Sequence, residues 1–182
     1  MFAYPLTSDA ELRLLEPRHA EALYALVDAN RAFLRRWLPW VETTVSVDDS
    51  RQFIRESLER LARSGDIVAG IWYHSQLAGV IDVCDINQSS GRAEIGYWLA
   101  EVHQGKGLMT LACKAVLNHA FGTLGLNRVQ IRVEPANTRS AAIPRRLGFR
   151  HEGTLRQVGK ARGRLIDLNI YSLLKNEWKA QP

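Results

Sequence analysis

A glycine-rich turn between a predicted strand and a predicted helix is the segment of this 182-residue chain best suited to chemistry. It runs from His103 to Thr110 and reads HQGKGLMT, with glycines at Gly105 and Gly107. Glycine lets the backbone approach a ligand closely, and a helix N-terminus offers unpartnered N–H groups and the positive end of the helix dipole. Such a turn can bind an anion, and a pyrophosphate fits it well.

Three interpretations of this turn compete. A phosphate-binding P-loop built on Gly105 and Lys106 would need glycine where Ala100 stands and Ser or Thr where Gly107 stands. A dinucleotide fingerprint, G-x-G-x-x-G, fails at its last position, which is Thr110. A plain turn joining a strand to a helix is the third interpretation, and an isolated Gly-x-Gly favours it.

Hydrophobic periodicity and turn residues predict the elements around this turn. The expected strands are residues 11–15, 66–73, 77–86, 92–100, 128–133, 149–158 and 167–174. The expected helices follow Pro17, cover residues 31–37, begin at the cap residue Ser46, cover residues 108–124, and run from the cap Asn137 to Arg146. Pro144 should kink or shorten the last helix because its ring removes a hydrogen bond. Lys160, Arg162 and Arg164 are expected in a loop.

This order of elements predicts one α+β domain over residues 1–182, with a mixed, mostly antiparallel sheet flanked by helices. The downstream segments add a family resemblance. Gln104-x-x-Gly107 opens a long helix, and Asn137-Thr138-Arg139-Ser140 and Leu147-Gly148-Phe149 follow about thirty residues later. In this order the motifs resemble the GNAT superfamily of acyl-CoA-dependent N-acetyltransferases. Trp37-Leu38-Pro39-Trp40, Ile95 to Leu99 and Asp167 to Trp178 resemble its RimJ/RimL branch, which acetylates protein N-terminal amines.

The resemblance implies a sheet with two splayed strands that hold acetyl-CoA between them, and no metal. It implies that the strand 94–99 contacts the pantetheine arm, that the turn binds the pyrophosphate, and that Asn137 lies beside the arm. The implied cofactor-binding residues are Trp98, Leu99, Gln104, Gly105, Lys106, Gly107, Leu108, Met109, Thr110 and Asn137. RimL-like enzymes carry a glutamate, assigned as general base, at the position where this chain has Gly159.

Two residues are the candidates for proton transfer. Ser140 would donate a proton to the departing thiolate, or it is only a first-turn helix residue that satisfies backbone groups. Glu94 would act as the base through water, or it is only a solvent-facing strand residue. Glu134 and His103 are weaker candidates for the same role. A free α-amine has a pKa of about 7.7 to 8.0, so a weak base suffices for it.

Three aromatic residues could line the acceptor site. Trp37 and Trp40 flank Leu-Pro at a helix end, and Tyr97 alternates with Trp98 across the predicted strand. Tryptophan in such a position is more often part of a core, so this assignment competes with a structural one.

Composition and charge narrow the class of protein. The net charge of +5 suits an anionic ligand, an acidic partner or nucleic acid, and nucleic acid ranks last because no aromatic–basic interleaving is present. The two cysteines, Cys84 and Cys113, are too few for a disulfide framework, and we expect both to be small buried side chains. The first residues lack the basic and apolar segments of a secretion signal. We therefore expect a cytoplasmic protein that does not enter a membrane, and the resemblance suggests a homodimer.

The functional expectation is transfer of the acetyl group of acetyl-CoA to a primary amine, first of all a protein or peptide N-terminus, in a ternary complex. The alternatives are acetylation of a small amine, such as a polyamine, an antibiotic or an amino acid conjugate, and a non-catalytic module that binds acyl-CoA. The sequence leaves the acceptor amine, the general base and the oligomeric state open.

Overall fold

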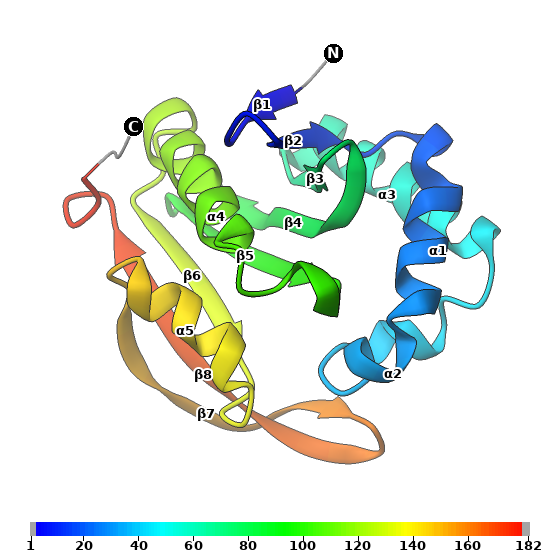
Figure 1. Cartoon of the computed structure of the whole chain (residues 1–182). Coiled ribbons are helices and arrows are strands. Elements are labelled where there is room, and N and C mark those ends of the chain that lie inside the picture. Colours follow the sequence, from blue (N-terminus) through cyan, green and yellow to red (C-terminus); the bar gives the residue numbers. More distant parts are fainter. Residues whose placement is uncertain (1–2, 180–182) are drawn as a thin grey trace. The chain divides into compact units, whose positions relative to one another are not determined.

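The computed structural model describes residues 3–179 of the chain (Figure 1). The strands are β1 (Ala3–Pro5), β2 (Ala10–Leu14), β3 (Ile67–Tyr73), β4 (Gln76–Asn87), β5 (Arg92–Leu99), β6 (Arg128–Val133), β7 (Arg150–Ala161) and β8 (Arg164–Leu174). The α-helices are α1 (Ala20–Ala29), α2 (Arg31–Leu34), α3 (Val47–Ser64), α4 (Leu108–Asn118) and α5 (Thr138–Arg146). Shorter helical turns are η1 (Pro17–His19), η2 (Pro39–Glu42), η3 (Glu101–His103) and η4 (His119–Thr123).

The strands form one mixed sheet in the order β1-β2-β3-β4-β5-β6-β8-β7. The chain divides into two compact units, unit 1 with residues 3–82 and 97–112 and unit 2 with residues 83–96 and 113–179. The predicted α+β class and mixed sheet are confirmed. The predicted domain extent, 1–182, stays a prediction, and its ends at residues 1–2 and 180–182 lie outside the described residues.

Unit 1 is built around an apolar core between helices and strands. Helix α1 packs against α3, and α3 packs against β3. The fully buried core side chains include Leu15, Val27, Val41 and Ile54. Helix α3 begins as the spacing of Ser46 and Asp49 predicts, because both members of the capping box form, and it ends at Gly65 in the left-handed conformation.

Unit 2 combines α5 with the antiparallel strands β6, β8 and β7. Strand β6 pairs with β8 along its whole length, from Arg128 opposite Leu174 to Val133 opposite Asn169. Helix α5 lies against β6 and β7 (Figure 1). Its bounds match the prediction because Asn137 caps it, accepting a hydrogen bond from the Ser140 N–H.

Strand β5 pairs with β6 in parallel over three residue pairs, which end at Glu94 opposite Gln130. Both strands continue within unit 2 beyond this pair, but they are no longer paired with each other. Strand β6 remains paired with β8 up to Val133. Parallel strands that part in this way are what the predicted splayed sheet requires.

Three predictions about local structure need correction. The helix expected to reach Leu124 ends at Asn118 and continues as the π-helix η4, a type of helix that side-chain periodicity does not distinguish. Pro144 does not shorten α5, which extends through it to Arg146. The segment expected as a loop is a hairpin end: Lys160 lies in β7 and Arg164 begins β8.

The cysteines differ in their surroundings. Cys113 is buried as expected, and burial raises the pKa of its thiol. Cys84 is only half-buried, so the expectation that both are buried is wrong for this residue. Within residues 3–179, no helix is long and apolar enough to cross a membrane.

Candidate active site

The glycine turn of unit 1 has the backbone that an anion site requires. Gly105 and Gly107 have φ angles of +76° and +77°, a conformation that L side chains rarely adopt. Both glycines are exposed, and α4 begins immediately afterwards at Leu108. The side chains of Leu108 and Met109 are buried, which anchors the first turn of the helix in the core. The N–H groups of that first turn therefore lie at an exposed, fixed helix N-terminus.

Two basic side chains flank this turn. The ammonium group of Lys106 lies 4.9 Å from the centre of the Tyr73 ring, within the range of a cation–π contact. The ring of His103 lies edge-on to Tyr73 at 6.0 Å. Burial, and then the positive charge of Lys106, lower the pKa of His103. His103 is therefore held in its neutral form near pH 7, which leaves Lys106 as the positive charge next to the turn.

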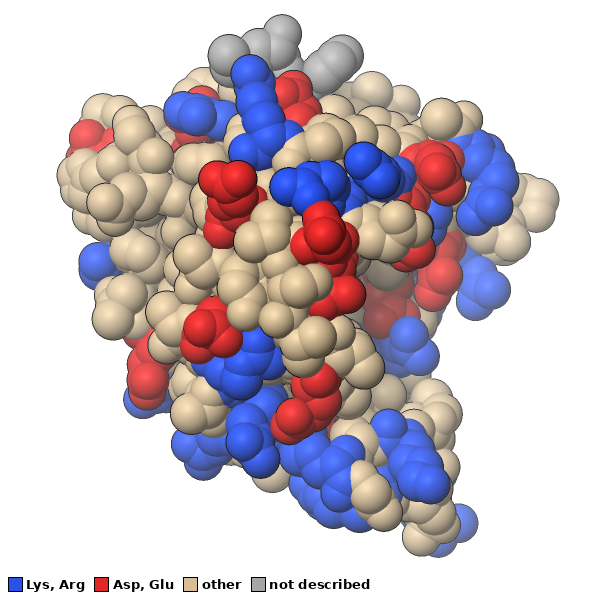
Figure 2. Space-filling model, turned by 90° about the vertical axis from the view of Figure 1, so that its right-hand side faces the viewer, with Lys and Arg blue, Asp and Glu red and all other residues tan. Residues whose placement is uncertain are grey.

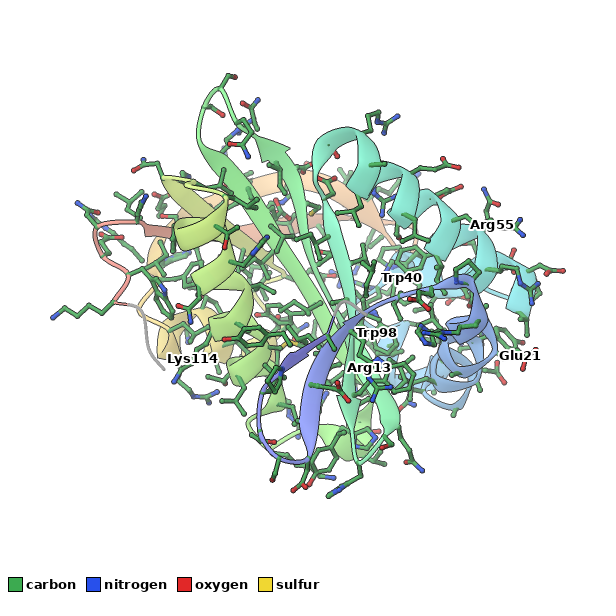
Figure 3. The ribbon with its side chains drawn as sticks, turned by 90° about the horizontal axis from the view of Figure 1, so that it is seen from above. Arg13, Glu21, Trp40, Arg55, Trp98 and Lys114 are labelled. Carbon is green, nitrogen blue, oxygen red and sulfur yellow. The ribbon has the colours of Figure 1, made fainter. Side chains whose placement is uncertain are left out.

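An aromatic pair lies in the same unit. The rings of Trp40 and Trp98 are 5.9 Å apart at an angle of 53°, and Figure 3 shows the two side chains next to each other. Trp40 is 39% exposed, whereas Trp98 packs against the core. Trp37 and Tyr97 are half-buried. The structure thus brings Trp40 to Trp98, the residue expected at the cofactor.

Arg31 fixes the turn that carries Trp40. Its guanidinium group donates hydrogen bonds to the carbonyl oxygens of Val41 at 2.5 Å and Thr44 at 2.7 Å. It also pairs with Asp28 at 3.1 Å, which orients the guanidinium from α1. Three contacts from one planar group hold η2 in place. This role could not be predicted from the sequence, because the partners of Arg31 on this turn are backbone carbonyls.

Asn30 links two segments of unit 1 that are far apart in the sequence. Its side-chain oxygen accepts a hydrogen bond from the Glu101 N–H at 3.0 Å, and its amide donates to the Leu26 carbonyl at 2.9 Å. Glu101 begins η3, the turn that leads to Gln104. Asn30 therefore joins the end of α1 to the segment that precedes the glycine turn.

Gly79 permits the approach of β5 to β4 in unit 1. A Cβ atom at this position would lie 2.3 Å from the Trp98 carbonyl oxygen and 2.9 Å from the Leu99 Cα atom. Only glycine fits at such a distance. The backbone of Trp98 and Leu99, predicted to contact the pantetheine arm, is fixed in part by this close approach.

The predicted base in unit 2, Glu94, is fully engaged. Its two carboxylate oxygens accept hydrogen bonds from Arg132 at 2.8 Å and from Gln130 at 3.0 Å. The side chain is 13% exposed, and the hydrogen bond with Glu94 raises the pKa of Arg132. Glu94 borders a polar cavity of about 450 Å³ together with Asp85 and Arg92. A catalytic role for Glu94 stays a prediction, since proton transfer would have to compete with these two partners.

The weaker candidate, Glu134, is engaged as well. Arg162 donates to both of its carboxylate oxygens at 2.7 and 2.8 Å, and Arg164 lies 3.4 Å away. Its side chain is 9% exposed. A bidentate pair in this position fixes the hairpin between β7 and β8 to the end of β6. The arrangement favours a structural role for Glu134.

Asn137 and Ser140 lie together at the start of α5. The Asn137 side-chain oxygen accepts from the Ser140 N–H at 3.2 Å, so it acts as the helix cap. Ser140 is half-buried, and its hydroxyl is not needed for the cap. Pro144 has no backbone N–H to donate to the Ser140 carbonyl. Both interpretations of Ser140 remain open on this geometry.

Comparison with known proteins identifies the family of this chain. The family described as "Acetyltransferase (GNAT) domain" matches residues 10–150, more than three quarters of the chain. The chain belongs to the GNAT acetyltransferase family. The resemblance predicted from the glycine turn and the segments after it is therefore confirmed.

Similar proteins support the RimJ/RimL branch of the GNAT family. A protein of Bacillus subtilis (strain 168), named putative ribosomal N-acetyltransferase YdaF, is 39% identical over 182 residues, which is 100% of each chain. The structure of RimL, a ribosomal-protein α-N-acetyltransferase in complex with coenzyme A, is 29% identical with a TM-score of 0.91 and covers 95% of this chain and 98% of that one. The microcin C7 self-immunity acetyltransferase MccE, in complex with acetyl-CoA and AMP, is 30% identical with a TM-score of 0.88 over 93% and 94%.

The GNAT match includes the glycine turn, Asn137 and Ser140, and it ends at Arg150, where β7 begins. Within unit 1 the structure brings together the turn with Lys106 and, separately, Trp40 with Trp98. Within unit 2 it brings Asn137 to Ser140, and it directs Glu94 to Arg132. Sequence reasoning missed the positioning residues Asn30, Arg31, Gly79, Gln130, Arg132 and Arg162. Their partners lie many positions away along the chain, so spacing carries no signal for them.

Proposed function

We propose that this GNAT protein transfers the acetyl group of acetyl-CoA to the α-amine of a protein or peptide N-terminus, by direct attack in a ternary complex. Family membership supports the acetyl transfer. Relatives named as ribosomal N-acetyltransferases support the polypeptide acceptor.

The glycine turn fits the pyrophosphate of coenzyme A. Gly105 and Gly107 expose their backbone at positive φ, and the N-terminus of α4 supplies N–H groups and a positive dipole end. Lys106 adds a positive charge beside the turn. Acetyl-CoA would supply the thioester, and the residues Gln104 to Thr110 would orient it by its phosphates.

The preference for an α-amine rests on one observation, that the carboxylates of Glu94 and Glu134 are both bound by other side chains. Glu94 is bound by Arg132 and Gln130, and Glu134 is bound by Arg162. Neither is positioned to accept a proton without loss of an ion pair. An α-amine, with a pKa of about 7.7 to 8.0, is partly neutral at pH 7, whereas a lysine amine at about 10.4 needs a base. A site with engaged carboxylates therefore suits α-amines.

The roles of the remaining residues follow from the bonds that change. A C–N bond forms between the amine and the acetyl carbon, the C–S bond breaks, and the amine loses one proton while the thiolate gains one. Ser140 would donate its hydroxyl proton to the sulfur and be reprotonated from water, which takes up the proton from the amine. Trp40, Trp98, Trp37 and Tyr97 would hold the acceptor, because aromatic faces exclude water from the reacting amine. Positioning of the two substrates supplies much of the rate.

A thiol-release assay tests this function. The purified protein and acetyl-CoA are incubated with peptides that differ in the first residue, with matched peptides whose N-terminus is already acetylated, and with polyamines and aminoglycosides. We expect coenzyme A release with free N-termini, a dependence on the first residue, and none with blocked peptides. Release that follows lysine content instead of the free N-terminus would contradict the choice of amine.

Two further outcomes have a defined meaning. Release with a small amine alone would favour small-molecule acetylation, which MccE as a relative also makes reasonable. Binding of coenzyme A in calorimetry without release from any amine would favour a non-catalytic acyl-CoA module. A homodimer and a cytoplasmic location remain predictions, which sedimentation and cell fractionation test.

A further inference from the structure

The end of the β7–β8 hairpin presents basic and apolar side chains to solvent. Leu155, Val158 and Leu165 are 43%, 46% and 56% exposed, and all three lie within eleven residues of one hairpin. Arg156 and Lys160 are exposed on the same segment. Among residues 3–179, no acidic side chain forms an ion pair with either of these two.

The charge of this hairpin is one-sided. Its acidic residues are already engaged: Glu152 pairs with Arg128 at 2.6 Å, and the Asp167 carboxylate accepts a hydrogen bond from the Gln157 N–H at 2.8 Å. Figure 2 shows Lys and Arg side chains gathered at its lower edge, and Figure 1 draws the end of the β7–β8 hairpin at its lower edge as well. The segment 155–165 thus forms a basic surface with apolar side chains among its charges, which we call the hairpin surface.

The hairpin surface is fixed to the segment that carries the candidate acid. Glu134 holds Arg162 through two hydrogen bonds, and the Glu134 carbonyl accepts from the Asn137 N–H at 2.9 Å. Asn137 caps the helix turn that contains Ser140. Within unit 2, a short chain of contacts therefore joins the hairpin surface to the proposed reaction site.

The hairpin surface also borders an open strand edge. Among the strands of residues 3–179, β7 is the last one of the sheet, so no described strand pairs with the backbone N–H and C=O groups on its outer side. An extended polypeptide can bind such an edge through its own backbone. The GNAT family model ends at Arg150, before this segment.

We propose that the hairpin surface docks an acidic, extended segment of the polypeptide substrate, a few residues after the N-terminal amine that is acetylated. This inference rests on the proposed function. Arg156 and Lys160 would face the acidic side chains, Leu165 and Val158 would contact the apolar ones, and the anchor Arg162 would keep the hairpin in place. Charge complementarity raises both the association rate and the selectivity for such a substrate.

A nucleic acid fits the hairpin surface less well. The segment 155–165, LRQVGKARGRL, contains no Phe, Tyr or Trp on which bases could stack, and its apolar side chains would meet a charged backbone. A single-stranded oligonucleotide is nevertheless included in the test, and so is a second copy of the chain.

The test compares two peptides that share their first residues and differ downstream, one with glutamates and one with glutamines. The variant is the pair Arg156→Gln and Lys160→Gln. The charge-preserving control is Arg156→Lys with Lys160→Arg. A second control, Arg55→Gln with Arg63→Gln, removes the same charge from the exposed side of α3 (Arg55 in Figure 3). Coenzyme A release gives kcat/KM, and fluorescence anisotropy of labelled peptides gives Kd.

We expect the neutralised hairpin to lose about five-fold in kcat/KM for the acidic peptide, since exposed ion pairs are individually weak. Its kcat at saturation, its KM for acetyl-CoA and its kcat/KM for the glutamine peptide should not change. High salt should remove the difference between the peptides in the unmodified protein. Both controls should behave like the unmodified protein.

Three results would overturn the proposal: equal loss for both peptides, equal loss in the α3 control, or an oligonucleotide that displaces the acidic peptide and binds more tightly. A dimer in sedimentation that dissociates on Leu165→Ser would assign the surface to a second copy instead. Hairpin-dependent binding of the acidic peptide without any acetylation would retain the docking surface and reject the proposed function. Acetylation of both peptides with no effect of the hairpin variant would do the reverse.

Discussion

In unit 1 the glycine turn is exposed and offers backbone groups, whereas in unit 2 both carboxylates considered as the base, Glu94 and Glu134, are held by arginines. Gly105 and Gly107 have no heavy atom within 4 Å of where a Cβ would lie, so the turn is open to a ligand. Glu94 and Glu134 are only 13% and 9% exposed. The difference suggests that the protein binds its cofactor with the backbone and leaves deprotonation to the amine itself.

The largest expected effect is that of removing the hydroxyl of Ser140, the candidate for proton transfer to the thiolate. We expect Ser140→Ala to lower kcat by about 100-fold, the lower end of the range for a general acid, with the KM for acetyl-CoA unchanged. The helix cap should survive, because it uses the Ser140 N–H and the Asn137 side chain. Steady-state kinetics and thermal unfolding measure the two effects.

Thr138→Ala is the matched control for Ser140, because Thr138 is an exposed hydroxyl residue at the start of the same helix. It should keep full activity. If Ser140→Ala also kept kcat within a factor of two, Ser140 would be only a helix residue, and the departing thiolate would have to take its proton from water.

A second prediction adds a carboxylate as a base, because the two carboxylates considered for this role, Glu94 and Glu134, are engaged by arginines. Gly159→Glu introduces the glutamate that the resemblance to RimL-like enzymes predicts at this position, where this chain has glycine. Its backbone does not have a positive φ, and a new Cβ would lie 3.2 Å from Cγ1 and 3.4 Å from Cδ1 of the Ile166 side chain, which must shift slightly. We expect about a 10-fold gain in kcat/KM at pH 7 with an acceptor of high pKa, such as a polyamine, and a smaller gain with an N-terminal α-amine.

Gly159→Gln separates basicity from shape for that variant. It has the same size and cannot accept the proton, so it should give no gain. The gain of Gly159→Glu should also follow the titration of one group in the pH profile of kcat/KM. An equal gain with glutamine would assign the effect to packing against Ile166 and would leave the question of the base where it stands.

A third prediction changes the other side of the comparison, the backbone of the glycine turn. Gly107→Ala adds no clash, since its Cβ would meet open space, but φ of +77° costs an L residue about 1–2 kcal/mol. We expect the KM for acetyl-CoA to rise about five-fold while kcat at saturation is kept. Gly122→Ala, also in open space but without a positive φ, should leave both constants unchanged.

Local signals explain how much of this molecule the sequence could predict. The start of α3 at Ser46, the bounds of α5 and the position of the glycine turn all depend on contacts within about four residues, which spacing encodes. The same holds for the hairpin turn at His74 and Ser75, where both residues have positive φ.

Long-range contacts explain what could not be predicted. The hydrogen bond from Glu101 to Asn30 spans 71 positions, and Glu94 finds Arg132 38 positions away. The sequence makes Glu94 a candidate base, and it does not reveal that Gln130 and Arg132 on β6 bind its carboxylate. The sequence predicts a loop where the structure has the end of the β7–β8 hairpin. The pairing of Lys160 with Leu165 depends on the register of β7 and β8 and not on local turn residues alone.

The smallest expected effect concerns the response of the two units to acid. Burial lowers the pKa of His19 and His103 in unit 1, so the unfolded chain binds protons below about pH 6.5 that the folded unit does not. Their contribution to stability is complete above that pH and is lost as the pH falls. In unit 2 the hydrogen bond from Arg128 lowers the pKa of Glu152 to about 2, so its contribution is lost only between about pH 4.5 and pH 2. Unit 1 should therefore loosen first.

Hydrogen exchange followed by mass spectrometry at pH 7 and pH 5.5, corrected for the intrinsic rate, tests this order. Segments of α1 and β3 should lose more protection than segments of β6 and β8. His103→Gln should remove part of the difference and reduce the loss of Tm between the two pH values by roughly 2 °C. His151→Gln, in unit 2, should not. Equal loss in both units would mean that acid acts on groups other than the half-buried imidazoles of His19 and His103, and the contrast between the units would then be confined to their chemistry.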